Sequence, residues 1–334
     1  MIGSMKTLIV AHVDYVTDPE PSADPVMFLL ETLAMPGTVP LLVAGTFTVL
    51  VLVLAWARWR PAETVRRRFI ERAETYREYL PWIVRLSVGL VLIGSGLARV
   101  LFLPTLEAGG LVSLLLTGTG FLLLLGLAVR PAALVALGAY LVTFVSHPDL
   151  VMMLDVPGAL GVAVLLGPGR PSLDDLLRAA APEAPGARVA TENLGDGRTD
   201  DLVPLVVRLG LGGAFAASGI ADKLLIHDQA LAAVERYELT SLVPVAPEVW
   251  VLGAILIETA LGIAILVGAF TRASAVVGFT VLTLALFALP DDPVIAHVGL
   301  FGLCSVLVIT GAGRWSLDRL VLEPFGRRLA EGRT

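Results

Sequence analysis

The sequence has few of the residues that build redox centres. Its 334 residues include one cysteine and four histidines. The single cysteine, Cys304, excludes a disulfide framework, a C-x-x-C pair and a cysteine-ligated iron–sulfur cluster. Among the histidines, only His147 and His297 could lie at positions that suit the two ligands of a bis-histidine haem. We therefore expect neither a metal nor a haem in this chain.

Charged residues are also scarce, at 16% of the chain, and the net charge is −6. The one arginine-rich stretch, residues 60–80, is interrupted by glutamates, which speaks against nucleic-acid binding. Its apolar residues recur at steps of three and four, namely Val65, Phe69, Ala73, Tyr76 and Leu80. This spacing predicts an amphipathic helix lying on the cytoplasmic leaflet of a membrane. A helix that docks a partner protein is the alternative.

Hydrophobic residues, by contrast, make up 56% of the chain. They form about nine runs, nearly all long enough to cross ~30 Å of hydrocarbon. The runs are 39–57, 82–103, 110–129, 131–146, 150–167, 204–226, 248–270, 272–289 and 293–311. Because lipid offers the backbone no partners, such runs are expected to be helices. We predict an all-α integral membrane protein with about nine transmembrane helices, in which the short runs 131–146 and 150–167 could form a tight hairpin.

Arginines and acidic residues alternate between successive turns. Arg58, Arg130 and Arg272 follow spans on one side of the membrane. Acidic residues such as Asp149 and Asp228 mark the other side. The arginine excess predicts an outside N-terminus and a cytoplasmic C-terminus. The chain is therefore expected in the cell membrane, as a multi-pass protein in contact with lipid.

The chain also contains an internal repeat. Residues 81–99, PWIVRLSVGLVLIGSGLAR, resemble residues 204–223, PLVVRLGLGGAFAASGIADK. Each copy continues to a Gly-x-x-x-Arg step, at 126–130 and 268–272, and to the related phrases GPGRPSLD and GAGRWSLD. We predict two parallel four-helix repeats, residues 81–178 and 204–320, related by a pseudo-twofold axis along the membrane normal. Any site is expected near their interface.

The remaining segments complete the predicted organisation. They are an extracytoplasmic tail (1–38), an extra span with the amphipathic helix (39–80), a flexible cytoplasmic linker (179–203) and a cytoplasmic tail (321–334). His12 and Asp14 in the first tail are too few to hold a metal. The GPGR and GAGR turns lack the Lys-Ser/Thr ending of a phosphate loop. Ser172 and Ser316 are instead predicted to cap short interfacial helices.

Several ionisable side chains fall at one depth inside the predicted spans. Counting helical rise from the cytoplasmic arginines and glycines places them about 18–22 Å up. They are Glu258, Lys223, His297, Asp222, Arg99 and Asp155. A charge near the bilayer centre costs about 2.5–3.5 kcal/mol, so each needs an explanation.

Lys223 and Arg99 lie near span ends, where long cations reach the interface without any functional role. Glu258 cannot reach so far, and we predict that it pairs with Lys223. Leu116 takes the place of Glu258 in the first repeat. This difference predicts one site per chain.

At these residues the chain resembles the DoxX/DoxD family of small membrane proteins. The family's opening Arg and Gly, and the Lys that closes its first span, are matched by Arg208, Gly212 and Lys223, with the Lys one place late in SGIADK. The Glu that precedes Gly-x-x-x-Arg is matched in IETALGIAILVGAFTR, from Glu258 to Arg272, and a later polar position by His297. The resemblance covers about 203–320 and is weaker in the first repeat. Two fused units and an extra span depart from the family's single-unit pattern.

The resemblance implies a membrane subunit of a quinone-linked oxidoreductase, of the thiosulfate:quinone type or similar. Glu258 would then accept protons, Lys223 would stabilise an oxyanion and His297 would relay protons. Candidate cofactor-binding residues are Arg99, Asp155, Asp222 and Arg272. Such a subunit requires a partner subunit as electron donor. A non-enzymatic scaffold or binding protein, and a small-molecule transporter, are the alternatives.

Overall fold

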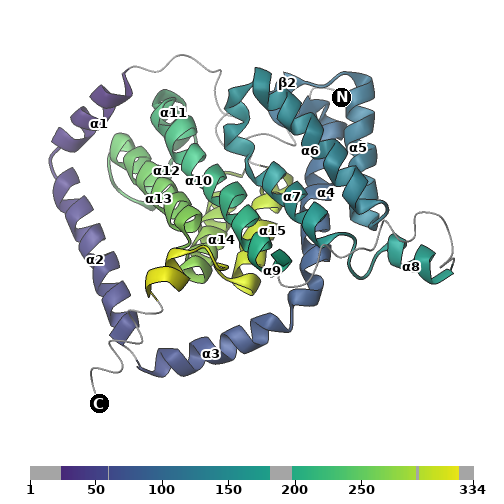
Figure 1. The fold of residues 1–334 in the computed structure, drawn as a ribbon. Coiled ribbons are helices and arrows are strands. Elements are labelled where there is room, and N and C mark those ends of the chain that lie inside the picture. The colour runs from purple at the N-terminus through teal and green to yellow at the C-terminus, as the bar shows by residue number, and fades with distance from the viewer. Residues whose placement is uncertain (1–23, 59, 181–197, 291–292, 323–334) are drawn as a thin grey trace.

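The computed structural model describes residues 24–58, 60–180, 198–290 and 293–322, and this part of the chain is almost wholly helical (Figure 1). An N-terminal arm comes first. It comprises α1 (Pro25–Ala34), α2 (Thr38–Arg58) and α3 (Arg60–Glu74). Asp24 caps α1 by accepting a hydrogen bond from the Val26 amide at 2.8 Å. Residues 25–34, which the sequence placed in a tail, thus form a helix, whereas His12 and Asp14 lie outside the described residues.

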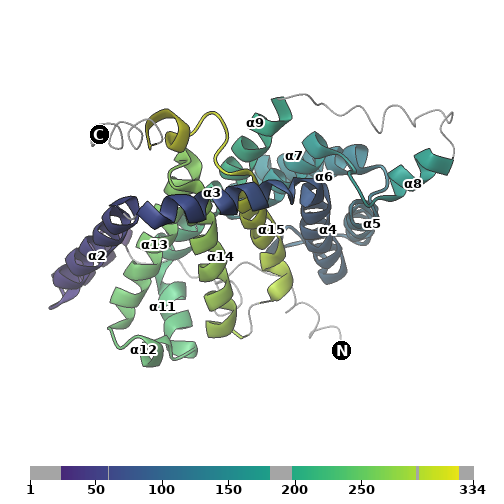
Figure 2. The same ribbon diagram turned by 90° about the horizontal axis from the view of Figure 1, so that it is seen from below.

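The three helices of the arm lie around the outside of the molecule. Helix α2 stands apart from the rest, and its described side chains beyond Thr38 are almost all exposed, including Val43, Phe47 and Val49 (Figure 1). Helix α3 crosses one end of the molecule and contacts α15 (Figure 2). The predicted apolar face of residues 60–80 is partly covered by protein, because Ala73 and Leu80 are buried while Val65 stays exposed.

An N-terminal bundle follows the arm. Its elements are the 3-10 turn η2 (Arg77–Tyr79), α4 (Leu80–Ala98), β1 (Val100–Leu101), β2 (Leu103–Glu107), α5 (Gly110–Leu125), α6 (Val129–Ser146), η3 (Pro148–Met153), α7 (Asp155–Leu166) and α8 (Leu173–Ala180). The predicted span 82–103 was too long. Helix α4 ends because Arg99 adopts a left-handed conformation at φ 58°, and an antiparallel hairpin of β1 and β2 follows.

A C-terminal bundle completes the described chain. Its elements are α9 (Arg198–Val207), η4 (Arg208–Gly212), α10 (Gly213–Ala217), η5 (Ser218–Leu224), α11 (His227–Arg236), α12 (Leu239–Leu242), α13 (Pro247–Val267), α14 (Thr271–Ala288), α15 (Val294–Thr310) and η6 (Asp318–Leu322). Helix α9 begins inside the predicted linker 179–203. The segments η4, η5 and η6 are π-helical turns.

The apolar helices make this a multi-pass membrane protein by length and composition. Among the described residues, five helices are long enough to span a bilayer, and a sixth span is possible if the pair α1 and α2, bent by 89°, counts as one. The five are Arg77–Ala98, Val129–Ser146, Asp201–Leu224, Pro247–Val267 and Thr271–Ala288. Three more predicted runs form the shorter apolar helices α5, α7 and α15.

In both bundles, an arginine and an aspartate side chain bond the turns at one end of the bundle to the ends of its helices. Arg85 donates hydrogen bonds to the carbonyls of Pro81 and Pro171, and Arg208 donates to Trp315 and three other carbonyls at 2.6–3.1 Å. Asp174 accepts from the Ala128 amide at 3.0 Å. Asp318 likewise accepts from the amides of Phe270 and Thr271 at 2.6 and 2.8 Å. These arginines and aspartates therefore tie turns to helix ends.

The segments GPGRPSLD and GAGRWSLD lie at the same end of the bundles, and each contains a serine that caps a helix. Ser172 Oγ accepts from the Asp175 amide at 3.2 Å and Ser316 Oγ from the Arg319 amide at 3.3 Å, so both predicted caps are confirmed.

The bundles contact each other through close glycine approaches. A Cβ placed on Gly158 of α7 would lie 2.8 Å from the Cα of Gly210 in η4. A Cβ placed on Gly302 of α15 would lie 1.9 Å from Ser87 Oγ in α4. The last helix of each bundle thus packs on the first helix of the other. One continuous core of buried apolar residues runs across this interface.

Candidate functional site

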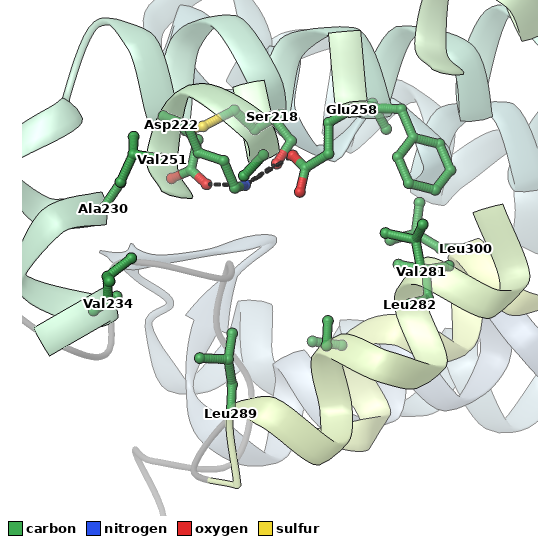
Figure 3. A pocket seen from close by; sticks show the side chains of 18 of the residues that line it. Ser218, Asp222, Ala230, Val234, Val251, Glu258, Val281, Leu282, Leu289 and Leu300 are labelled. Carbon is green, nitrogen blue, oxygen red and sulfur yellow. Dashed lines mark hydrogen bonds and ion pairs between the residues drawn. The ribbon is translucent and has the colours of Figure 1, made fainter. Parts of the chain in front are cut away.

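A cavity of about 120 Å³ lies inside the C-terminal bundle, on the side that faces the N-terminal bundle (Figure 3). Most of its walls come from η5, α11, α13 and α14, while α10 and α15 contribute two residues each and α12 contributes one. Met152, Met153 and Asp155 reach it from the N-terminal bundle. The cavity is therefore built by both bundles, near the interface where the sequence predicted a site.

One wall of the cavity carries a cluster of charged side chains. Lys223 Nζ lies 2.8 Å from Glu258 Oε2 and 3.2 Å from Asp222 Oδ2. It also donates a hydrogen bond to Ser218 Oγ at 3.0 Å. The side chains of Lys223, Asp222 and Glu258 are only 12%, 4% and 17% exposed. The predicted pairing of Glu258 with Lys223 is confirmed.

The π-helical turn η5, Ser218–Leu224, positions Lys223. A π turn holds one more residue than an α turn, so it absorbs a single inserted residue without breaking the helix. The sequence SGIADK carries its lysine one place later than the pattern it resembles. The π turn offsets that extra residue, and Lys223 reaches Glu258 on α13.

Helix α13 presents one stripe of side chains to the cavity. Trp250, Val251, Ala254 and Glu258 line it and recur at the spacing of one helix face. Helix α14 and the residue that follows it face this stripe with Val281, Leu282, Ala285 and Leu289 (Figure 3). Apart from the charged cluster and Trp250, these two helices offer only apolar groups. Between the charged cluster and Trp250, the walls that these two helices supply are thus apolar.

Helix α11 forms a third wall and is held from outside by the N-terminal arm. Ala230 and Val234 line the cavity and also pack in a cluster with Phe28 of α1. The Phe28 ring stacks on the buried His227 ring at 4.3 Å between centroids. Helix α1, which belongs to neither predicted repeat, therefore supports the wall of the cavity.

Asp155 is the charged contribution of the N-terminal bundle. It is 3% exposed, begins α7 and lines the cavity. A Cβ placed on Gly299 of α15 would lie 2.6 Å from Asp155 Oδ2. Only glycine at this position of α15 leaves room for the carboxylate.

The other predicted site residues lie elsewhere. His297 is fully buried in α15, with Nδ1 3.3 Å from the Pro293 carbonyl, and is not among the residues that line the cavity. Arg99 is exposed at the end of α4. Arg272 donates to the carbonyls of Val308 and Ile309 at 3.0 and 3.2 Å, at the far end of α15. Glu258, Lys223, Asp222 and Asp155 line the same cavity, and these three are not among its lining residues.

Sequence reasoning did not include two polar groups of the cavity, Ser218 and Trp250. Ser218 lies five residues before Lys223, a spacing that faces the lysine only because the helix has a π turn. Trp250 lies near the end of a predicted span, where tryptophan is expected at the membrane interface, so the sequence did not indicate that it lines the cavity.

Chemically, the cluster places an ammonium group and a carboxylate side by side at the end of an apolar cavity. Glu258 Oε2 is ion-paired with Lys223, yet it receives no well-aligned hydrogen bond from any described residue. Its remaining lone pairs can therefore accept a bond from a bound molecule. No set of three His, Cys, Asp or Glu side chains suited to a metal ion occurs in the described part of the chain.

The fold and the cavity together define a helical membrane protein with a buried ion cluster. Residues 203–291 match the model of the DoxX family, which confirms the resemblance read from the sequence over this part of the chain. The matched region contains η5 and α13, and with them Lys223 and Glu258. No match was found among curated proteins or among solved structures.

Proposed function

We propose that the chain is a quinone-binding membrane subunit of an oxidoreductase and that the head of the quinone enters the cavity of the C-terminal bundle. The observation that carries this proposal is the Lys223–Glu258 ion pair, 2.8 Å long, at the end of an apolar cavity. Families with a DoxX unit are often linked to oxidoreductases, which supports the same reading.

The residues present fit such a molecule. A cavity of about 120 Å³ approaches the size of the ~150 Å³ engineered cavity that accepts one benzene ring. The apolar stripes of α13 and α14 suit a hydrocarbon ring and the start of its tail. Lys223 can donate to an oxygen of the ring, and Glu258 Oε2 can accept a hydrogen bond.

When bound, a quinone supplies the capacity to take up electrons and protons. The chain's own groups then have separate tasks. Lys223 stabilises negative charge on an oxygen, Glu258 holds or releases a proton, and Asp222 keeps the Lys223 ammonium in place. Asp155 adds a third carboxylate, from the opposite bundle. The chain is expected to carry no redox group of its own, so a partner subunit would deliver the electrons.

The content of bound quinone tests the proposal. The full chain is extracted in a mild detergent, and the quinone in its lipid fraction is measured against protein. We expect a stoichiometric amount in the wild type and its loss in Glu258→Gln. The matched control is Glu248→Gln, which changes a carboxyl on the same helix that does not line the cavity. Quinone that merely follows total lipid in all three preparations would refute the proposal and favour a scaffold.

We also propose that each bundle is one copy of a four-helix unit, which with α2 gives nine spans. Matched contacts support this. Gly96 approaches Thr117 Oγ1 as Gly219 approaches Thr259 Oγ1, with Cβ positions at 2.2 and 2.4 Å. The packing of Gly158 on Gly210 and of Gly302 on Ser87 is reciprocal, as a twofold relation requires.

The proposed orientation places the N-terminus outside and the C-terminus in the cytoplasm. In a Cys304→Ser background, a single cysteine at Asp149 should react with a membrane-impermeant maleimide in intact cells. A single cysteine at Arg170 should react only after lysis. Both native side chains are exposed, so access is not limited by packing. The reverse pattern would overturn the orientation.

A further inference from the structure

Trp250 and Asp155 are the polar side chains of the cavity that lie outside the ion cluster, and the position of Trp250 on α13 gives the further inference. Trp250 lies in the first turns of α13 and lines the cavity. Its indole Nε1 is buried and has no hydrogen-bond partner among the described residues. A buried indole N–H normally donates a hydrogen bond, because without an acceptor the free-energy cost of removing it from water is not recovered. The missing acceptor is expected to come from whatever fills the cavity.

Trp250 and the ion cluster occupy different levels of the same cavity. Trp250 precedes Glu258 by eight residues on α13, a rise of about 12 Å along the helix. The lining residues of α13 between them, Val251 and Ala254, are apolar. In Figure 3, Leu289, the residue that follows α14, also lies away from Glu258. The cavity therefore has hydrogen-bonding groups at two ends and hydrocarbon between them.

We propose that the ligand is an elongated amphiphile with polar groups at both ends. Its head meets Lys223 and Glu258, and a second acceptor oxygen further along the molecule, a carbonyl or an ester, receives the indole N–H of Trp250. This inference rests on the proposed function, since it takes the same cavity as the ligand site. It narrows the ligand class, because a plain hydrocarbon tail leaves the indole N–H unsatisfied.

Two synthetic probes test this directly. Both are benzoquinones with a short alkyl chain, and one carries a keto oxygen in the chain at the distance of Trp250. Their dissociation constants are measured for the wild-type chain, for Trp250→Phe, which keeps the ring and loses the N–H, and for Trp82→Phe. Trp82 is an exposed tryptophan of α4 outside the cavity and serves as the matched control.

We expect the keto probe to lose about fivefold to tenfold in affinity for Trp250→Phe, as the loss of one hydrogen bond implies. The plain probe should bind Trp250→Phe and the wild type alike, and Trp82→Phe should bind both probes as the wild type does. Equal losses for the two probes, or none for the keto probe, would overturn the inference. Failure of both probes to bind the wild type saturably would instead refute the proposed function.

A second measurement covers the case in which Trp250→Phe does not fold. In a variant that keeps Trp250 as its only tryptophan, the keto probe should quench the indole fluorescence with saturation at its own dissociation constant. Quenching that rises linearly with probe, as expected for a tryptophan that meets only dissolved quinone, would overturn the inference.

Discussion

The N-terminal and C-terminal bundles close their helix ends alike but fill their interiors differently. Glu258 comes one residue before Thr259, whose side chain packs closely against Gly219. Leu116 stands one residue before Thr117, the residue that receives Gly96, and it is 5% exposed in the core. Where one bundle has a carboxylate against a cavity, the other has a packed leucine.

The N-terminal bundle also fills its interior with aromatic rings. Tyr140 of α6 donates a hydrogen bond to the Leu150 carbonyl at 2.6 Å and packs edge-on against Phe102 at 5.2 Å. Both rings are nearly fully buried. On α14, the corresponding wall of the C-terminal bundle offers Leu282 to the cavity. The arginine and glycine contacts thus build the scaffold of both bundles, while a few interior substitutions decide whether a bundle contains a site.

The largest loss of stability is expected at the arginines that bond the turns to the helix ends. Arg208→Leu removes the donor for four backbone carbonyls and should lower the free energy of unfolding by at least about 4 kcal/mol. Arg85→Leu removes two such bonds and should cost about half as much. Denaturant unfolding of both variants in one detergent measures the difference. An equal loss would show that the two closures are energetically alike despite their different bonds.

The next effect concerns the ion cluster. Lys223→Met leaves Glu258 and Asp222 without their cation and should destabilise the chain by about 3 kcal/mol, because unpaired buried charge is costly. Adding Asp222→Asn and Glu258→Leu removes the orphaned carboxylates and copies the apolar interior of the other bundle. This triple variant should regain most of the stability and bind no quinone. If the single and triple variants were equally stable, the cluster would not be buried as the comparison requires.

Much of this contrast could be predicted from the sequence, because it depends on residue type at fixed spacing. The apolar runs predicted the helices, and the mid-span Glu258, whose place in the first repeat is taken by Leu116, predicted the pair with Lys223. One site per chain stays a prediction. Counting helical rise brought Glu258, Lys223, Asp222 and Asp155 to one depth, and all four line the cavity.

Depth alone does not give the direction in which a side chain points. His297 and Arg99 were predicted at the same depth, but His297 is enclosed in the core, Arg99 ends α4 in a left-handed conformation, and neither is a lining residue, so their roles stay predictions. The π turn at Ser218–Leu224 also has no signature in hydrophobic periodicity, so the place of Ser218 could not be read. Helix length was overestimated at α4, where the backbone turns into a hairpin.

A smaller effect tests the contact between the bundles. Gly302→Ala places a methyl group on Ser87 and should cost about 2 kcal/mol through overpacking. Ser87→Gly should rescue it, because the reciprocal contact has a glycine on each side, Gly158 and Gly210. Thermal unfolding of the single and double variants gives the coupling between the two positions. If the double variant were no more stable than Gly302→Ala, the Gly302–Ser87 and Gly158–Gly210 contacts would not be equivalent.

The smallest effect lies in the sealed interior of the N-terminal bundle. Tyr140→Phe keeps the ring against Phe102 and removes only the hydroxyl that donates to the Leu150 carbonyl, so the loss should be about 1 kcal/mol. Tyr79→Phe, at an exposed tyrosine, should change nothing. Quinone content should stay at the wild-type level in both, because the hydroxyl lies outside the cavity of the other bundle. A loss of quinone in Tyr140→Phe would mean that the two interiors are coupled through η3, which carries both Leu150 and Met153, rather than independent as their different packing indicates.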